Sequence, residues 1–345
     1  MSLLVLYKLL AIFITVALGW FAGRMRWLGE ASSQTDPARM LSNAAFFIFI
    51  PALMFRTTAR VDLQALPWTT LLAYFVPALM IMLGVYAGLR WAQGRTETAP
   101  AAQATATATA ATATAARPAV RAFAVTFGNS VQVGIPLAAA LFGEAGLGIH
   151  ITLVSLHALV VLTVITVLVE LDIARSRAAR SPAGAGNLWR TLSSTARSAV
   201  IHPVVLPVLA GLVWNLAGLP WPDALDETFK LLSSAVAPLC LVLIGLSLAY
   251  SGVGGTWRGA LGVSALKLLA LPALALVVAH WGFGLTGLAL QVVVVMAALP
   301  TGSNPLIFAQ RYRTLEGETT AVIVLSTLGF VVTLPMWLAI LARLA

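Results

Sequence analysis

An apolar segment of the chain is interrupted at Phe127-Gly128-Asn129-Ser130-Val131-Gln132-Val133-Gly134-Ile135-Pro136. Apolar residues lead into this stretch and out of it over a length that would span a membrane as a helix. Hydrocarbon offers no hydrogen-bond partner, so a helix breaks at that depth only where its freed backbone groups face protein or a wet cavity. We therefore expect Gly128, Gly134 and Pro136 to break a membrane helix.

A second interruption lies near the other end of the chain, at Leu299-Pro300-Thr301-Gly302-Ser303-Asn304-Pro305. Its helix-breaking residues are Pro300, Gly302 and Pro305, and apolar sequence again flanks them. Two Gly/Pro-interrupted apolar segments in corresponding places of two halves indicate the binding site of a transporter. The pair of interruptions therefore favours a membrane carrier.

The composition is that of a polytopic membrane protein. Of 345 residues, 60% are hydrophobic and 10% are charged, and the mean hydropathy is +0.93. So few charges cannot cover the surface of a soluble chain of this length. The net charge of +9 does not indicate nucleic acid binding, because the arginines lie between apolar segments, as in cytoplasmic loops. The single cysteine, Cys240, excludes an intrachain disulfide.

Ten segments are apolar and long enough to be membrane spans. They are residues 3–23, 38–56, 67–89, 119–142, 147–170, 199–218, 228–250, 257–280, 284–309 and 319–343. The loops on one side hold 15 Lys and Arg, and those on the other side, with both termini, hold 5. Because cytoplasmic loops are enriched in these residues, we expect a multi-pass protein of the plasma (inner) membrane with both termini outside the cytoplasm.

Two cytoplasmic linkers are predicted. Residues 91–118 contain a low-complexity Ala/Thr run without large side chains to bury, and residues 173–198 are rich in Arg, Ser, Pro and Gly. The second linker divides a first half, 1–172, from a second half, 199–345. Each half has five spans, so the second half begins on the opposite side of the membrane and the repeat is inverted.

Three residue pairs occupy matching spans of the two halves. They are Gly19 and Gly211, Pro77 and Pro272, and Pro136 and Pro305. Pro136 and Pro305 are separated by fewer residues than the members of the other two pairs. The difference is about the length of the extra Ala/Thr linker. The pairs support an inverted repeat in which alternating access occurs around a site at mid-membrane.

The two interrupted stretches resemble signatures of the auxin efflux carrier family. Phe127 to Gly146 is similar to its fourth-span signature, and Leu299 to Tyr312 to its ninth-span signature. The resemblance covers essentially the whole chain and implies the all-helical fold of ten spans shared with bile acid:sodium symporters. In that fold spans 1, 2, 6 and 7 form a scaffold, and spans 3–5 and 8–10 form a mobile, elevator-like transport domain with crossed helices. It also implies transport of organic anions such as auxin, malate or malonate, and a homodimer.

Each break exposes N–H groups at the start of the second half of its helix, where the helix dipole adds partial positive charge. Two such ends meeting in mid-membrane would bind a carboxylate without Arg or Lys. The side chains that would complete its hydrogen bonds are Asn129, Ser130, Gln132, Thr301, Ser303 and Asn304. The resemblance places the family's substrate-binding asparagine at Asn129; the alternative for the whole set is that it satisfies the freed backbone groups.

Three further polar residues lie inside predicted spans. Asn43 either lines the facing wall of the site or serves helix packing. His157 either carries a proton or hydrogen-bonds a neighbouring helix. Lys267 either compensates the charge of the substrate or extends to the interface. All twelve acidic residues fall in loops or at span ends, so no carboxylate relay is predicted and coupling to Na⁺ or H⁺ stays open. His150, His202 and His280 lie at span ends without ligand spacing between them, so neither a metal site nor a cofactor is predicted.

The sequence favours a secondary transporter that moves a small organic anion, auxin-like or a dicarboxylate, by alternating access. The alternative is a sodium-coupled symporter of bile-acid-type anions, which dependence of uptake on Na⁺ would distinguish. An enzyme is not supported, because neither clustered acids nor a nucleophile with its base appears. A receptor or channel would show no saturable exchange. The expected partners are the anion, the lipid bilayer and a second copy of the chain, without nucleic acid.

Overall fold

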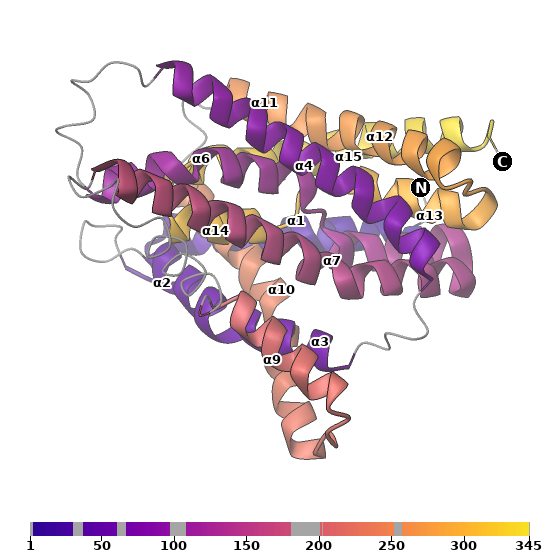
Figure 1. The fold of residues 1–345 in the computed structure, drawn as a ribbon, viewed down its shortest axis with the longest axis horizontal. Coiled ribbons are helices and arrows are strands. Elements are labelled where there is room, and N and C mark those ends of the chain that lie inside the picture. Colours follow the sequence, from indigo (N-terminus) through magenta and orange to yellow (C-terminus); the bar gives the residue numbers. More distant parts are fainter. Residues whose placement is uncertain are drawn as a thin grey trace.

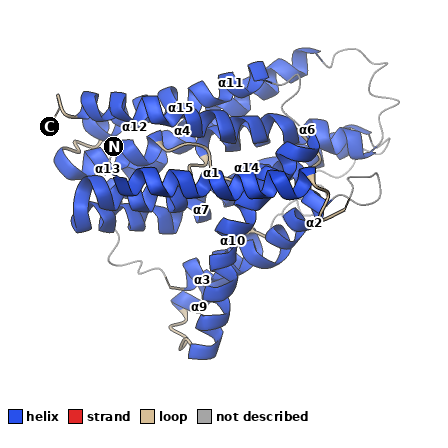
Figure 2. Cartoon of the chain, turned by 180° about the vertical axis from the view of Figure 1, so that it is seen from behind, coloured by secondary structure: helices blue, strands red, loops and turns tan. Residues whose placement is uncertain are grey.

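The computed structural model describes residues 3–29, 37–60, 67–96, 108–180, 201, 203–251 and 257–344. Within these ranges all regular secondary structure is helical (Figure 2). The helices of the first half are α1 (Leu3–Arg24), α2 (Pro37–Ala44), α3 (Ile50–Ala59), α4 (Trp68–Thr96), α6 (Ala108–Thr126) and α7 (Ile135–Arg180). Those of the second half are α9 (Val205–Leu216), α10 (Asp223–Ser251), α11 (Trp257–Ala265), α12 (Leu271–Val277), α13 (Gly287–Ala298), α14 (Asn304–Arg311) and α15 (Glu316–Leu341).

Six helical segments of the described residues are long and apolar enough to cross a membrane. They are Pro37–Ala59, Trp68–Gln93, Leu137–Ser176, Asp223–Tyr250, Trp257–Gly282 and Glu316–Leu341. Two further apolar helices, Val205–Leu216 and Gly287–Ala298, are shorter. The chain is therefore an all-helical integral membrane protein.

Three π-helical turns precede prolines. The turns Ala45–Phe49, Ser130–Gly134 and Leu266–Ala270 are each followed, two residues later, by Pro51, Pro136 and Pro272 respectively. Proline has no N–H, and its ring crowds the carbonyl four residues before it, which in each case lies inside the π turn. The wider turn accommodates this carbonyl and keeps the helix continuous.

The helices pack in pairs that bring small residues close to neighbouring backbone. α1 lies along α10, and α3 lies along α9. A Cβ on Gly19 would lie 2.2 Å from the carbonyl oxygen of Val242, and one on Gly211 would lie 2.6 Å from that of Phe55. Both contacts therefore require glycine.

Long helices lie alongside one another in a bundle from which α3, α9 and the beginning of α10 project (Figure 1). The first residues of α1 and the last of α15 lie at the same end of the bundle in both views (Figures 1 and 2). α7 bends at Gly143, whose φ of +62° suits glycine, so the predicted fourth and fifth spans meet there without a loop.

The predicted Ala/Thr linker at residues 91–118 differs from the structure. α4 continues to Thr96 and α6 begins at Ala108, so the expectation of an unstructured linker is wrong for these two parts. Alanine is the strongest helix former, and its small side chain allows close packing of α6 on α4, where Gln93 donates to the carbonyl of Thr114 at 3.4 Å. Residues 97–107 lie outside the described residues.

The ends of two other predicted segments also shift. In the predicted linker 173–198, α7 continues helically to Arg180, and residues 181–198 lie outside the described residues. In the predicted span 199–218, the described helix, α9, begins only at Val205 and ends at Leu216.

Candidate functional site

Two helices are interrupted at the stretches that the sequence singled out. α6 ends at Thr126 and helical structure resumes at Ser130, while α13 ends at Ala298 and α14 begins at Asn304. Of the predicted helix-breaking residues, Gly128, Pro300 and Gly302 lie in the non-helical stretches, whereas Gly134, Pro136 and Pro305 lie in the helical turns that follow them. We call residues 127–129 the first break and residues 299–303 the second break.

The two breaks are joined by a short antiparallel bridge between Gly128 and Thr301. Asn129 donates its N–H to the carbonyl oxygen of Pro300 at 2.8 Å. Gly302 donates its N–H to the carbonyl oxygen of Phe127 at 2.9 Å. Each break thus satisfies backbone groups of the other, as burial away from water requires.

Two other helices accept the remaining N–H groups of the bridge. His157 Nε2, on α7, accepts the N–H of Gly128 at 3.3 Å, and Ser326 Oγ, on α15, accepts the N–H of Thr301 at 3.0 Å. Because Nε2 is an acceptor, the imidazole is neutral with its proton assigned to Nδ1, which lies 3.1 Å from the hydroxyl of Tyr74. Both ring nitrogens of His157 are therefore engaged in holding the first break.

Buried side chains also bind carbonyl groups at the ends of the helices that lead into the breaks. The hydroxyl of Thr301 donates to the carbonyl of Ala124 at 2.9 Å, and Lys267 Nζ donates to the carbonyl of Ala297 at 3.0 Å. Lys267 is fully buried, and a Cβ on Gly128 would lie 3.4 Å from its Nζ. The ammonium group therefore lies behind the first break, at the negative end of the α13 dipole, and does not extend to the interface.

The helix starts that follow the breaks lack side-chain caps. Asn129 precedes the π turn Ser130–Gly134 and Ser303 precedes α14, and neither side chain caps the N–H groups of its helix. The first N–H groups of a helix have no partner within it and carry partial positive charge. Two such helix starts, beside each other, form an environment suited to an anion.

Both helix starts line a cavity of about 550 Å³. The breaks contribute Gly128, Asn129, Gly302 and Ser303 to its wall, and the helix starts that follow them contribute Ser130 and Asn304. α7 contributes Thr152 and Ser155, and α10 contributes Ser233. Arg56, near the end of α3, and Arg60, directly after it, also line the cavity, together with apolar side chains. A cavity of this size and mixed character suits a small organic molecule.

A second cavity, of about 380 Å³, shares Asn129 and Ser303 with the first. Its other walls come from α1, α10 and α15 and are almost entirely apolar. The first cavity touches α10 at Ser233 and Val236, whereas the second touches it from Leu241 onwards. Since an α-helix rises about 1.5 Å per residue, the two cavities lie at different levels along α10, with the breaks between them.

The predicted binding residues divide into three groups. Asn129, Ser130 and Asn304 are buried and Ser303 is half-buried, and all four line the larger cavity. Thr301 is fully buried, bonds backbone groups and lines neither cavity. The other two were Asn43, which is exposed on α2 and lines neither cavity, and Gln132, whose side chain lies outside the described residues.

The predicted helix-breaking residues lie at the two breaks or beside them. A Cβ on Gly134 would lie 2.5 Å from His150 Nε2 and 2.8 Å from Leu299 Cδ1, so only glycine fits between α7 and the second break. Pro305 lies in the first turn of α14, where a missing N–H costs little. Pro136 follows the π turn, with its side chain outside the description.

Sequence reasoning did not identify several residues of the site. Arg56 and Arg60 were counted only as loop charges, although both line the larger cavity. His150 donates from Nε2 to the carbonyl of Ser130 at 2.9 Å, and Ser326 supports the second break. Their partners are distant in sequence, so no local pattern indicates these contacts. Among the residues that the structure describes, no group of three His, Cys, Asp or Glu could hold a metal.

Comparison with known proteins identifies the family of the chain. The profile of a family described as "Membrane transport protein" matches residues 4–338. The chain is 26% identical over 331 residues to the uncharacterized transporter YfdV of Escherichia coli, covering 96% of this chain and 95% of that protein. It is 24% identical over 335 residues to an uncharacterized transporter of Methanothermobacter thermautotrophicus, covering 96% and 97%. Auxin efflux carrier component 3a of Oryza sativa is 29% identical over 157 residues, covering 44% of this chain and 24% of that protein.

Proposed function

The chain belongs to the membrane transport protein family, that of the auxin efflux carriers, and from this membership we propose that it carries a small organic anion by alternating access. It is a transporter and not an enzyme. The observation that carries the proposal is the pair of uncapped helix starts, joined by the bridge, on the wall of one cavity. The transported anion is a carboxylate, either auxin-like or a dicarboxylate.

The carboxylate binds between the two helix starts. The side chains of Asn129, Ser130 and Asn304 line the cavity there and supply donors beside the backbone N–H groups. The dipoles of both helices favour negative charge at this position, so binding requires no arginine or lysine in direct contact. Ser303 completes the wall between the helix starts.

Alternating access is supported by the two cavities. Asn129 and Ser303 line both of them, so an anion held at the breaks would be reached from one level through the larger cavity and from the other through the smaller. In the proposed arrangement of ten spans, with crossed fourth and ninth spans, spans 1, 2, 6 and 7 are the scaffold. The remaining spans move as the transport domain.

A 5+5 inverted repeat is supported by the glycine contacts of the scaffold. Gly19, in the first span, packs on Val242, which lies four residues after Pro238 in the seventh span. Gly211, in the sixth span, packs on Phe55, which lies four residues after Pro51 in the second span. The same contact thus occurs once in each half with the roles of the halves exchanged.

The distribution of Lys and Arg supports a plasma-membrane orientation with both termini outside the cytoplasm. With that orientation the larger cavity opens outward, because it is lined by the end of α3 and the beginning of α10. The homodimer is carried over from the family resemblance and stays a prediction. Native mass spectrometry in detergent would detect it.

The driving force is proposed to be the membrane potential acting on the anion. His157 uses both ring nitrogens in hydrogen bonds, which favours a positioning role over a proton relay. Uptake into proteoliposomes should follow an imposed potential. Uptake that ignores the potential, follows a proton gradient and stops in His157→Gln would contradict this, and dependence on Na⁺ would favour the sodium-coupled alternative.

The test of the site compares two asparagines. Asn129→Ala should abolish saturable uptake and ligand-induced thermal stabilisation by the anion, because it removes a donor and acceptor from the cavity wall. Asn43→Ala is the matched control, since this exposed side chain lines neither cavity and its loss should leave both measurements unchanged. Full affinity in Asn129→Ala would mean that the amide is structural and would refute the proposed site.

A further inference from the structure

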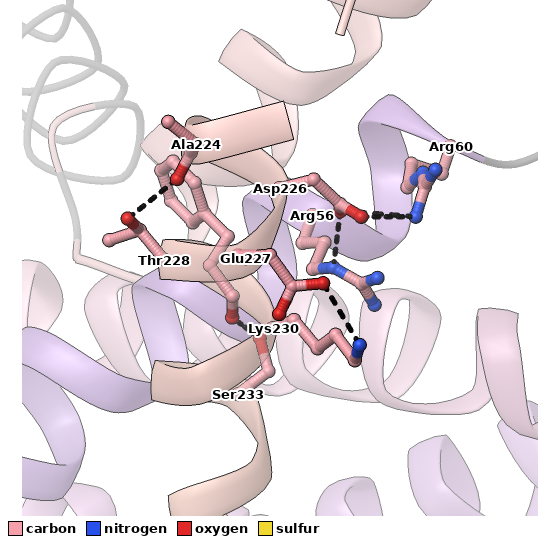
Figure 3. Close-up of polar contacts among 9 residues, drawn as sticks. Arg56, Arg60, Ala224, Asp226, Glu227, Thr228, Lys230 and Ser233 are labelled. Carbon is pink, nitrogen blue, oxygen red and sulfur yellow. Dashed lines mark hydrogen bonds and ion pairs between the residues drawn. The ribbon is translucent and has the colours of Figure 1, made fainter. Parts of the chain in front are cut away.

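Two arginines that line the larger cavity, Arg56 and Arg60, form a charged cluster with Asp226 (Figure 3). Arg56 Nε lies 2.9 Å from Asp226 Oδ1, and Arg60 Nη1 lies 3.0 Å from both carboxylate oxygens. Both arginines line the cavity, whereas Asp226 does not. Two guanidinium groups therefore share one carboxylate, and the surplus positive charge faces the cavity.

The neighbouring pair of Glu227 and Lys230 does not change this surplus. Glu227 directly follows Asp226 and pairs at 3.0 Å with Lys230, one turn further along α10, so the two together add no net charge (Figure 3). Arg56 uses only Nε towards Asp226, and its two terminal nitrogens extend beyond that contact (Figure 3). A guanidinium group has five N–H donors arranged to bind a carboxylate through two of them. Arg56 thus has donors left for a second anion.

We propose that Arg56 and Arg60 form a second anion subsite, and that the transported substrate carries two anionic groups, one at the breaks and one at these arginines. The lining of the same cavity also includes the apolar side chains of Leu53, Val154 and Val236, and the polar side chains of Thr152, Ser155 and Ser233. The substrate class is therefore a dicarboxylate with an apolar body. Asp226 holds the arginines in place when the cavity is empty and shares them with the second carboxylate when it is filled.

This inference rests on the proposed function, and it is tested with pairs of ligands that differ by one charge. The probes are α,ω-dicarboxylates of four to eight carbons and the monomethyl ester of each, with affinity read from ligand-induced thermal stabilisation. The best dicarboxylate should bind roughly tenfold more tightly than its ester, as expected for one charge-assisted bidentate contact. If no dicarboxylate binds more tightly than its ester, the second subsite does not exist.

Variants then assign the preference to the arginines. In Arg56→Gln the affinity ratio of dicarboxylate to ester should fall towards one while the affinity for the ester stays unchanged. Asp226→Asn should raise the ratio, because it frees both guanidinium groups, and this gain of affinity cannot come from misfolding. Lys230→Gln, which removes an exposed cation outside the cavity wall, is the control and should leave the ratio unchanged.

Two results would overturn the assignment. One is an unchanged ratio in Arg56→Gln, and the other is a ratio that falls in Asp226→Asn. Failure of the proposed function has a different signature, because Asn129→Ala should weaken the dicarboxylate and the ester together. If Asn129→Ala weakens neither while Arg56→Gln still lowers the ratio, the arginine subsite stands and the site at the breaks does not.

Discussion

The two breaks share one backbone arrangement but differ in the side chains that support it. An imidazole, His157, accepts the N–H of Gly128 at the first break, and a hydroxyl, Ser326, accepts that of Thr301 at the second. A hydroxyl also binds the carbonyl end of α6, whereas an ammonium, that of Lys267, binds the carbonyl end of α13. At each break the backbone needs one side chain that accepts from an N–H and one that donates to a carbonyl. Different residue types can fill these two roles, so the two breaks need not use the same side chains.

The breaks also differ in how tightly the following helix is packed. After the first break the chain passes through the π turn, where Gly134 touches His150 and Leu299. Within the second break, a Cβ on Gly302 would lie 3.0 Å from the ring of Phe127. Gly134, after the first break, therefore has less room for an added side-chain atom than Gly302.

The largest effect is expected from Gly134→Ala, which should lower the free energy of unfolding by about 3 kcal/mol. Its Cβ would clash with a histidine ring that is itself hydrogen-bonded to Ser130. Gly302→Ala should cost less, and Gly84→Ala, in open space on α4, should cost nothing. Thermal unfolding in detergent gives the order. A normal unfolding temperature for Gly134→Ala would show that the first break is not held between α7 and the second break.

The acceptors of the bridge should give a smaller effect. His157→Leu leaves the N–H of Gly128 buried without a partner and should cost about 2 kcal/mol, whereas His157→Gln retains an acceptor and should recover part of it. Ser326→Ala, the corresponding change at the second break, should cost about 1 kcal/mol. The same unfolding measurement checks both. Equal losses in the Leu and Gln variants would mean that packing, and not the hydrogen bond, explains the role of His157.

The smallest effect on stability is expected from Lys267→Met, because removing a buried charge also removes its desolvation cost, and the net change should stay within about 1 kcal/mol. Anion affinity should fall roughly tenfold, since the positive charge behind Gly128 is lost. The control is Thr301→Val, which removes the hydroxyl that donates to the carbonyl of Ala124 without changing the charge. This variant should leave the anion affinity unchanged. Titration of each of these two variants with the anion measures the difference in affinity. Equal affinity in Lys267→Met and the native chain would show that this ammonium is only structural.

The positions of the breaks could be predicted from the sequence because glycine and proline act locally. A proline lacks its N–H wherever it lies, and glycines such as Gly128 and Gly302 stand out in an apolar segment. The partners of the breaks could not be predicted, because His157 and Ser326 belong to helices whose facing sides depend on tertiary packing. The sequence left open whether His157 carries a proton or hydrogen-bonds a neighbouring helix. Its hydrogen-bond partners are known only from the structure.

The second predicted span shows why the cavity-facing side of a helix could not be followed from the sequence. Asn43 and Arg56 lie on opposite sides of the π turn Ala45–Phe49, which adds a residue to one turn and rotates the following helix. The side of the helix that faces the cavity therefore cannot be followed through it by counting residues. Asn43 is exposed, whereas Arg56, which the sequence analysis counted only as a loop charge, lines the cavity.

The Ala/Thr run illustrates a different limit. Low complexity and small side chains favoured a linker, yet alanine has the highest intrinsic helix propensity and packs closely on a neighbouring helix. α6 accordingly begins at Ala108, and Ala111 and Ala116 are buried. Composition alone does not reveal that α4 is available to pack against it.

A structure determined with a bound anion, by electron cryomicroscopy with the tightest-binding dicarboxylate, tests the central claim most directly. We expect density for a carboxylate within hydrogen-bonding distance of Asn129 and of the first N–H groups after both breaks. Density for the anion elsewhere, with side chains filling the space between Ser130 and Asn304, would contradict the account.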